Sequence, residues 1–242
     1  MAFKKATRKK VKLKLWIFGP SWSGKTMSAL KLARGMVDDR SKIAVLDTEN
    51  WSASLYADIG EFDTSVLKPP FTPERYIEQI KEAYNAWYEV LIIDSITQEW
   101  KWKWGILEMK ESMTGNDFAK RWVLTKLHNK FLSAILQVPM HVIVTGRTKE
   151  EYSMVTWTDW RLKVEKAGTN IEQRDWIEYE VTCSFTLDIK HNALSSKDRT
   201  WLFMDKPAFV ITEETWKMLK ERCDLWITND SNAEQEPSDN KE

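Results

Sequence analysis

The strongest chemical signal in the sequence is the segment Gly19-Pro20-Ser21-Trp22-Ser23-Gly24-Lys25-Thr26, which has the pattern G-x-x-x-x-G-K-T. It follows a strand-like run, 11–18, and opens a helix-like run, 26–37. In that context, backbone N–H groups and the helix N-terminus are expected to bind phosphate oxygens. The pattern assigns Lys25 to the β- and γ-phosphates of ATP and the Thr26 hydroxyl to Mg²⁺. The residues expected to contact the nucleotide here are Gly19, Pro20, Ser21, Trp22, Ser23, Gly24, Lys25, Thr26 and Met27.

Two further segments place a carboxylate at the end of a buried strand. The apolar run 90–93 precedes Asp94, whose carboxylate is expected to hold the Mg²⁺ shell, although a surface acid is the alternative. The strand 43–46 ends in Asp47 and is followed by Glu49 at its tip. Glu49 is the candidate for positioning or deprotonating the attacking water, with a helix-capping acid as the alternative. Asp47 is a second candidate for this role, but its side chain is expected to face differently.

Alternating strands and helices must position these groups. Fully apolar strands that alternate with helices predict an α/β fold with a mainly parallel central sheet covered by helices on both faces. Ligands of such sheets bind at the carboxyl ends of the strands, so the polar strand ends are expected to face one pocket. A C-terminal β extension and a terminal helix follow. The expected strands are 11–18, 43–47, 90–93, 141–145, 177–189, 201–204 and 209–211, and the main helices are 26–37, 73–88, 106–112, 118–137 and 213–223.

Length and composition favour one large domain. The chain has 242 residues, and its 36 Lys and Arg balance 36 Asp and Glu. We expect a basic flexible arm at 1–10, an ATPase domain at 11–227 and a disordered acidic tail at 228–242. Two cysteines are too few for a disulfide framework, which favours a reducing, cytoplasmic compartment. No apolar run approaches the roughly 18 residues of a membrane span, and the basic start lacks the apolar stretch of a signal peptide.

The chain resembles the RecA-type recombination ATPases, in their compact phage-encoded branch, over about residues 10–220. This resemblance implies a RecA-like P-loop NTPase core, a protein encoded by a phage and acting in the bacterial cytoplasm, and ATP and Mg²⁺ as ligands. It also supports Glu49 as the catalytic carboxylate. The segments that carry the resemblance are Gly19–Thr26, Asp47–Asn50, Ser52–Tyr56, Pro69–Arg75, Leu91–Ser95 and Ile177–Glu180.

The same resemblance implies two loops that line single-stranded DNA. By position they correspond to 97–116 and 148–174. Thr145 and Arg147 lie where the family has a polar sensor between nucleotide and DNA, so Thr145 joins the expected nucleotide contacts. The residues assigned to nucleic acid are Lys101, Lys103, Arg147, Lys149 and Arg174.

Lys197 and Arg199 resemble the family's Lys-x-Arg element, whose cations reach the γ-phosphate of a neighbouring subunit. Positive charge delivered in this way would stabilise the transition state and couple hydrolysis to assembly. An exposed charged turn is the alternative. The partners implied are single-stranded DNA, further copies of the chain in a ring or filament, and a single-strand-binding protein.

The tryptophan content is unusual. The chain has 14 Trp and 8 Gly, whereas average usage gives roughly 17 Gly in this length. We hypothesise that many tryptophans are glycines in the natural protein, because genetic codes differ in reading UGA as Gly or Trp. The rival interpretation is a Trp-rich nucleic-acid binder, in which 100–104 stacks on bases. The positions assigned to glycine are Trp22, Trp51, Trp102, Trp104, Trp157, Trp160, Trp176, Trp201 and Trp216.

These observations predict an ATP-hydrolysing recombination protein that acts on single-stranded DNA. Two other classes stay open: a P-loop kinase for a small molecule, and a non-hydrolysing nucleotide switch or assembly factor. A kinase would need an acceptor pocket and an Arg-rich lid, and the sequence has no clear lid. The three histidines have no metal-binding spacing, which favours ordinary surface or core roles.

Overall fold

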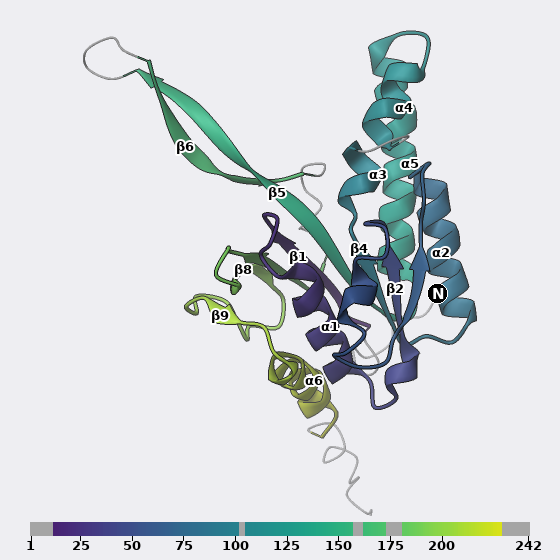
Figure 1. The fold of residues 1–242 in the computed structure, drawn as a ribbon, viewed down its shortest axis with the longest axis vertical. Coiled ribbons are helices and arrows are strands. Elements are labelled where there is room, and N and C mark those ends of the chain that lie inside the picture. The colour runs from purple at the N-terminus through teal and green to yellow at the C-terminus, as the bar shows by residue number, and fades with distance from the viewer. Residues whose placement is uncertain (1–11, 102–104, 157–161, 173–180, 229–242) are drawn as a thin grey trace, which may run out of the picture.

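The computed structural model describes residues 12–101, 105–156, 162–172 and 181–228 (Figure 1). The expected basic arm at 1–10 lies outside the described residues. So does the expected tail from 229 onward, whereas Thr228 is the last residue of helix α6.

A nine-stranded mixed sheet forms the centre of the described chain, and its order is β3-β2-β4-β5-β1-β7-β8-β9, with β6 paired to β5. The strands from β3 to β7 along this order are parallel, whereas β6, β8 and β9 pair antiparallel. The α/β fold and the mainly parallel sheet predicted from the sequence are therefore confirmed. The strands are β1 (Lys14–Gly19), β2 (Ile43–Asp47), β3 (Asp63–Val66), β4 (Val90–Asp94), β5 (His141–Thr156), β6 (Leu162–Ile171), β7 (Cys183–Leu187), β8 (Asn192–Asp198) and β9 (Phe209–Val210).

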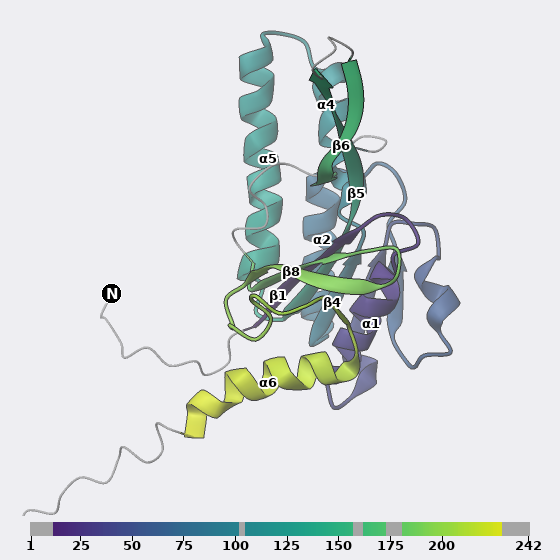
Figure 2. The same ribbon diagram turned by 90° about the vertical axis from the view of Figure 1, so that its left-hand side faces the viewer.

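Helices cover both faces of the sheet because its central strands are apolar on both sides. In β1, Leu15 and Ile17 pack in the cluster that includes residues of α1 and α6, whereas Trp16 and Phe18 pack in the cluster that includes residues of α2 and α5. Figure 2 shows these helices around the sheet. No helix among the described residues is long and apolar enough to cross a membrane. The helices are α1 (Lys25–Met36), α2 (Pro73–Asn85), α3 (Thr97–Lys101), α4 (Ile106–Ser112), α5 (Asp117–Gln137) and α6 (Glu213–Thr228), with short 3₁₀ turns η1 (Arg40–Lys42) and η2 (Ala53–Tyr56).

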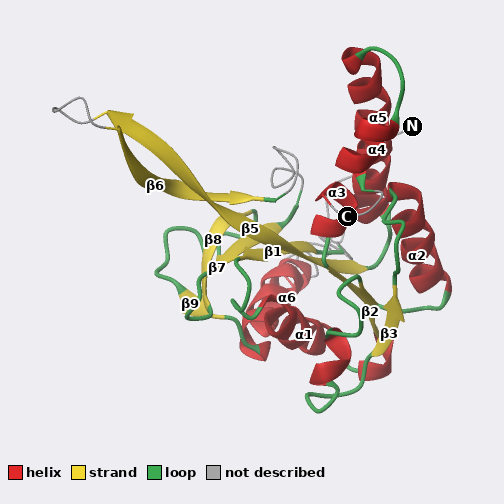
Figure 3. Ribbon diagram, turned by 45° about the horizontal axis from the view of Figure 1, so that its top comes forward, coloured by secondary structure: helices red, strands yellow, loops and turns green. Residues whose placement is uncertain are grey.

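Two extensions project from the same side of this core: a tower of α4 and α5, and the β5–β6 hairpin (Figures 1 and 3). The sequence predicted polar, irregular structure over 148–175 with a possible short strand near 161–164, but β5 continues to Thr156 and pairs with β6 from Thr148↔Ile171 to Thr156↔Leu162. The irregular structure was wrongly predicted because the sequence of this segment shows no sustained apolar alternation. The strand expected at 201–204 is a turn. Of the expected strand 177–189, residues 177–180 lie outside the described residues, and 183–187 form β7.

Candidate nucleotide and metal site

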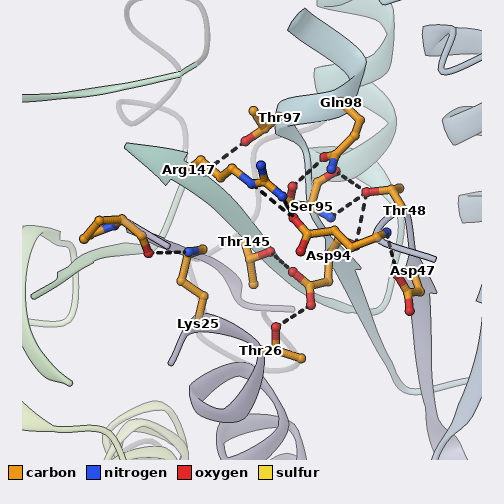
Figure 4. A network of polar contacts seen from close by, with 12 residues as sticks. Lys25, Thr26, Asp47, Thr48, Asp94, Ser95, Thr97, Gln98, Thr145 and Arg147 are labelled. Carbon is orange, nitrogen blue, oxygen red and sulfur yellow. Dashed lines mark hydrogen bonds and ion pairs between the residues drawn. The ribbon is translucent and has the colours of Figure 1, made fainter. Parts of the chain in front are cut away.

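The glycine-rich loop lies where β1 ends and α1 begins. Gly24 has φ of +83°, in the left-handed region that glycine adopts without strain, and α1 starts at the next residue. The Lys25 ammonium donates a hydrogen bond to the Pro20 carbonyl oxygen at 2.8 Å, across its own loop (Figure 4). Burial lowers the pKa of Lys25, and the nearby Asp94 and Glu49 carboxylates partly offset that shift. The loop therefore holds one cation close to the backbone N–H groups expected to bind phosphate.

The two residues expected to bind a metal lie together. The Thr26 hydroxyl donates to Asp94 Oδ2 at 2.6 Å, and the Thr145 hydroxyl donates to the other carboxylate oxygen (Figure 4). Burial raises the pKa of Asp94, while the hydrogen bonds from Thr145 and Thr26 lower it in part. A hydroxyl and a buried carboxylate beside a phosphate loop are the oxygen donors that Mg²⁺ takes from protein, so these residues fit that ion.

Asp47 shapes the turn that carries Glu49. One carboxylate oxygen of Asp47 accepts from the Glu49 backbone N–H at 2.6 Å, and the other accepts from the Ala53 N–H at 3.0 Å. The Asp47 side chain is fully buried, so both its oxygens serve the fold of this turn. Next to it, the Thr48 hydroxyl accepts from the Ser95 N–H at 2.8 Å, beyond a cis peptide bond between Asp94 and Ser95. These contacts fix the tip of β2 against the end of β4.

Glu49 is ion-paired with Arg147. Its carboxylate oxygen Oε1 lies 2.6 Å from Nη2 and 3.2 Å from Nε of the guanidinium. Arg147 follows the buried part of β5, and the hydroxyl of Thr97 in α3 accepts from its backbone N–H at 2.9 Å (Figure 4). The candidate catalytic carboxylate and the expected DNA sensor therefore neutralise each other here. A DNA contact by Arg147 would require it to exchange this partner.

The described residues of the two expected DNA loops also touch. The Lys101 ammonium forms an ion pair with Glu172 Oε1 at 2.8 Å, which joins the end of α3 to the end of the β5–β6 hairpin. The backbone N–H of Glu172 in turn donates to the Arg147 carbonyl oxygen at 2.8 Å. Lys149 is exposed at the start of the hairpin. Lys103 and Arg174, also assigned to DNA, lie outside the described residues.

Lys197 and Arg199 lie away from the P-loop, toward the amino-terminal edge of the parallel strands, because Lys197 pairs with Ser184 of β7 and the Arg199 N–H donates to the Thr182 carbonyl oxygen just before β7. Lys197 is on β8, which is separated from β1 by β7, whereas β4 and β2 lie beyond the opposite neighbour of β1. The Asp198 carboxylate between the two cations accepts from the N–H groups of Thr200 and Phe203, both at 2.7 Å. It thereby fixes the turn after β8. Arg199 is exposed and follows β8, so several strands of the sheet separate it from Glu49 and Asp94.

Two features of this edge were not predicted from the sequence as parts of the site. The first is a pocket of about 510 Å³ beside the Glu49–Arg147 pair. The proline-rich segment 68–73 forms part of its lining. The second is His191, whose imidazole lies against Gly24 of the P-loop. The residues lining the pocket are Thr48, Glu49, Asn50, Val66, Leu67, Lys68, Pro69, Phe71, Gln98 and Arg147.

Among the described residues, four tryptophans adopt a left-handed backbone, including one inside the P-loop. Their φ angles are 66° at Trp22, 70° at Trp51, 64° at Trp87 and 62° at Trp201. Glycine is the usual residue in this region, so the geometry agrees with the glycine hypothesis at these positions and adds Trp87. Trp216 differs, because its side chain is buried in the core between α6 and α1, which favours tryptophan over glycine at this position. The other positions assigned to glycine lie outside the described residues: Trp102, Trp104, Trp157, Trp160 and Trp176.

The parallel sheet, the loop between β1 and α1, and Asp94 at the end of β4 together define a P-loop NTPase. A family model described as an AAA domain matches residues 11–210, and the chain belongs to this family. A comparison with curated proteins finds no match.

Proposed function

We propose that the protein is an ATP-dependent recombination protein that binds single-stranded DNA and hydrolyses ATP faster when DNA is bound. The observation that carries this proposal is the ion pair between Glu49 and Arg147. It connects the candidate catalytic carboxylate to the base of the β5–β6 hairpin, which corresponds to the second expected DNA loop.

In this proposal the P-loop and Lys25 hold the phosphates of ATP, and Lys25 exchanges the Pro20 carbonyl for a phosphate oxygen. Thr26 and Asp94 would hold Mg²⁺, which when bound neutralises charge on the phosphates. Glu49 orients the attacking water and accepts its proton. Glu49 can do so only when its carboxylate is released from Arg147, because the oxygen that accepts from the guanidinium is not available to a water molecule.

DNA stimulation follows from competition for cations. A DNA phosphate near the hairpin would attract Lys101 and Arg147, which the protein now pairs with Glu172 and Glu49. Because Glu172 and Arg147 are also joined through a backbone hydrogen bond, the two pairs are expected to open together. The release of Glu49 would then link DNA binding to hydrolysis.

Assembly into a ring or filament is part of the proposal. Lys197 and Arg199 lie toward the edge of the sheet opposite the P-loop of their own chain, so in this proposal they act on the nucleotide of a neighbouring copy. Cations supplied by a neighbour would make hydrolysis depend on assembly.

ATP turnover measured with and without single-stranded DNA tests this function. We expect strong stimulation by DNA in the parent protein, and ATP binding with little turnover in Glu49→Gln. Lys25→Ala is the control that should lose ATP binding altogether. Turnover that DNA does not change would contradict the recombination proposal, and binding without any turnover would indicate a nucleotide switch.

A small-molecule kinase is the second candidate, and the pocket beside Glu49 favours it. This pocket of about 510 Å³ combines apolar side chains with Lys68, Gln98 and Arg147, as an acceptor site would require. The same assay separates the two functions, because a kinase would consume ATP only when a small hydroxylated or phosphorylated acceptor is added.

A further inference from the structure

The turn between β7 and β8 packs against the P-loop. Strand β7 runs parallel to β1, with Phe18 paired to Thr186, so the turn that follows Leu187 lies at the same edge of the sheet as the loop. A Cβ atom on Gly19 would lie 2.9 Å from the Leu187 carbonyl oxygen, and one on Gly24 would lie 3.0 Å from Nδ1 of His191. Both motif glycines therefore allow close approach by this turn.

Hydrogen bonds hold the turn in one conformation. The Asp188 carboxylate accepts from the backbone N–H groups of Lys190 at 2.8 Å and Asn192 at 2.9 Å, and from the Asn192 side-chain amide at 3.0 Å. The bonds from Asn192 are the main reason that the pKa of Asp188 is lowered. His191 itself has φ of 67° and an exposed side chain. The backbone that carries its imidazole is therefore held in one conformation. The ring lies beside Gly24 and remains accessible to a ligand.

The sheet order indicates which part of a nucleotide this imidazole would meet. Asp94 and Glu49 follow β4 and β2, which lie on one side of β1, and these residues are expected at the γ-phosphate end. Strand β7 is the neighbour of β1 on the opposite side. A nucleotide whose phosphates lie in the loop, with its γ-phosphate toward Glu49, extends its other end toward the β7–β8 turn.

We propose that His191 contacts the nucleoside half of bound ATP and that the β7–β8 turn forms the wall of the site on that side. This inference rests on the proposed function, because it requires that ATP binds in the P-loop. It adds a recognition residue from outside the motif. The imidazole offers a planar ring and a ring N–H, both of which suit a purine or a ribose hydroxyl.

Binding of three probes to His191→Asn tests the proposal: ATP, ADP and inorganic tripolyphosphate, which lacks a nucleoside. Asparagine tolerates the left-handed backbone, so the turn keeps its conformation while the ring is lost. We expect ATP and ADP to bind roughly 5- to 100-fold more weakly, the range that loss of an aromatic contact to a base produces. Tripolyphosphate should bind the variant and the parent equally well.

Lys25→Ala is the matched control and should lose all three probes, because Lys25 is expected to contact phosphate. If His191→Asn weakened the binding of ATP and of tripolyphosphate equally, His191 would only shape the P-loop. If ATP binding were unchanged, His191 would make no contact with the nucleotide. Either result overturns the inference. Failure of the parent protein to bind any probe would instead overturn the ATP function on which the inference rests.

Discussion

Replacing four tryptophans by glycine is expected to stabilise the protein. Trp22, Trp51, Trp87 and Trp201 all have φ between 62° and 70°, where an L-residue with a Cβ is strained. Their side chains are 93%, 55%, 80% and 76% exposed, so their removal sacrifices little buried apolar surface. The backbone conformation therefore dominates the effect of each substitution.

The magnitude follows from two opposing contributions. A left-handed conformation costs a residue other than glycine roughly 1–2 kcal/mol. Glycine loses more backbone entropy on folding, which offsets about 0.5–1 kcal/mol of that gain. Each substitution should thus raise the free energy of unfolding by about 0–1.5 kcal/mol, with about 0.75 kcal/mol as the central value. The four positions are separate in sequence, so their effects should add to about 3 kcal/mol.

Urea unfolding measures this change as a higher midpoint at a constant slope. Trp122 provides a matched control, because it is also exposed, at 56%, but lies within helix α5. Trp122→Gly should destabilise the protein by about 1 kcal/mol, since glycine is a poor helix former. Trp216 is only 2% exposed, and Trp216→Gly should cost about 3–5 kcal/mol through loss of a buried side chain.

A variant with all four substitutions that is no more stable than the parent would refute backbone strain at these positions. Equal stabilisation by Trp122→Gly would also refute it, because the gain would then come from removing surface tryptophan rather than from relieving the backbone. The gene offers an independent check: UGA codons at the four left-handed positions would support the glycine hypothesis, and UGG codons there would contradict it.

Glu49→Gln should reduce ATP turnover by about 10²-fold or more while ATP affinity stays within a few-fold, because the residue acts on water rather than on phosphate. Arg147→Met should raise turnover without DNA and reduce the stimulation by DNA, as measured in paired assays; lower DNA-free turnover would contradict the pairing argument. Burial lowers the pKa of His141 to about 3, so the unfolded chain takes up this proton first as pH falls below about 6.5. Stability should therefore decrease by about 2 kcal/mol between pH 7 and pH 5, and His141→Gln should abolish most of that loss in urea titrations.

The sequence alone determined the parts of the site that depend on neighbouring residues. The P-loop is a local motif, since its backbone conformation and the start of α1 follow from consecutive residues. Asp94 and Glu49 were found because each follows a short apolar strand, and the carboxyl ends of parallel strands share one edge. The alternation of apolar strands with helices also sufficed for the α/β class and the parallel sheet, which the structure confirms.

Only the tertiary structure decided which of these groups meet. Arg147 and Glu49 are separated by 98 positions in the chain, and no local pattern records their pairing. The close approach of His191 to Gly24 likewise depends on β7 lying beside β1. The β5–β6 hairpin escaped prediction because its strands are held by pairing with each other, whereas sequence patterns report burial. Contacts between distant segments follow from sheet order, and sheet order is a property of the whole fold.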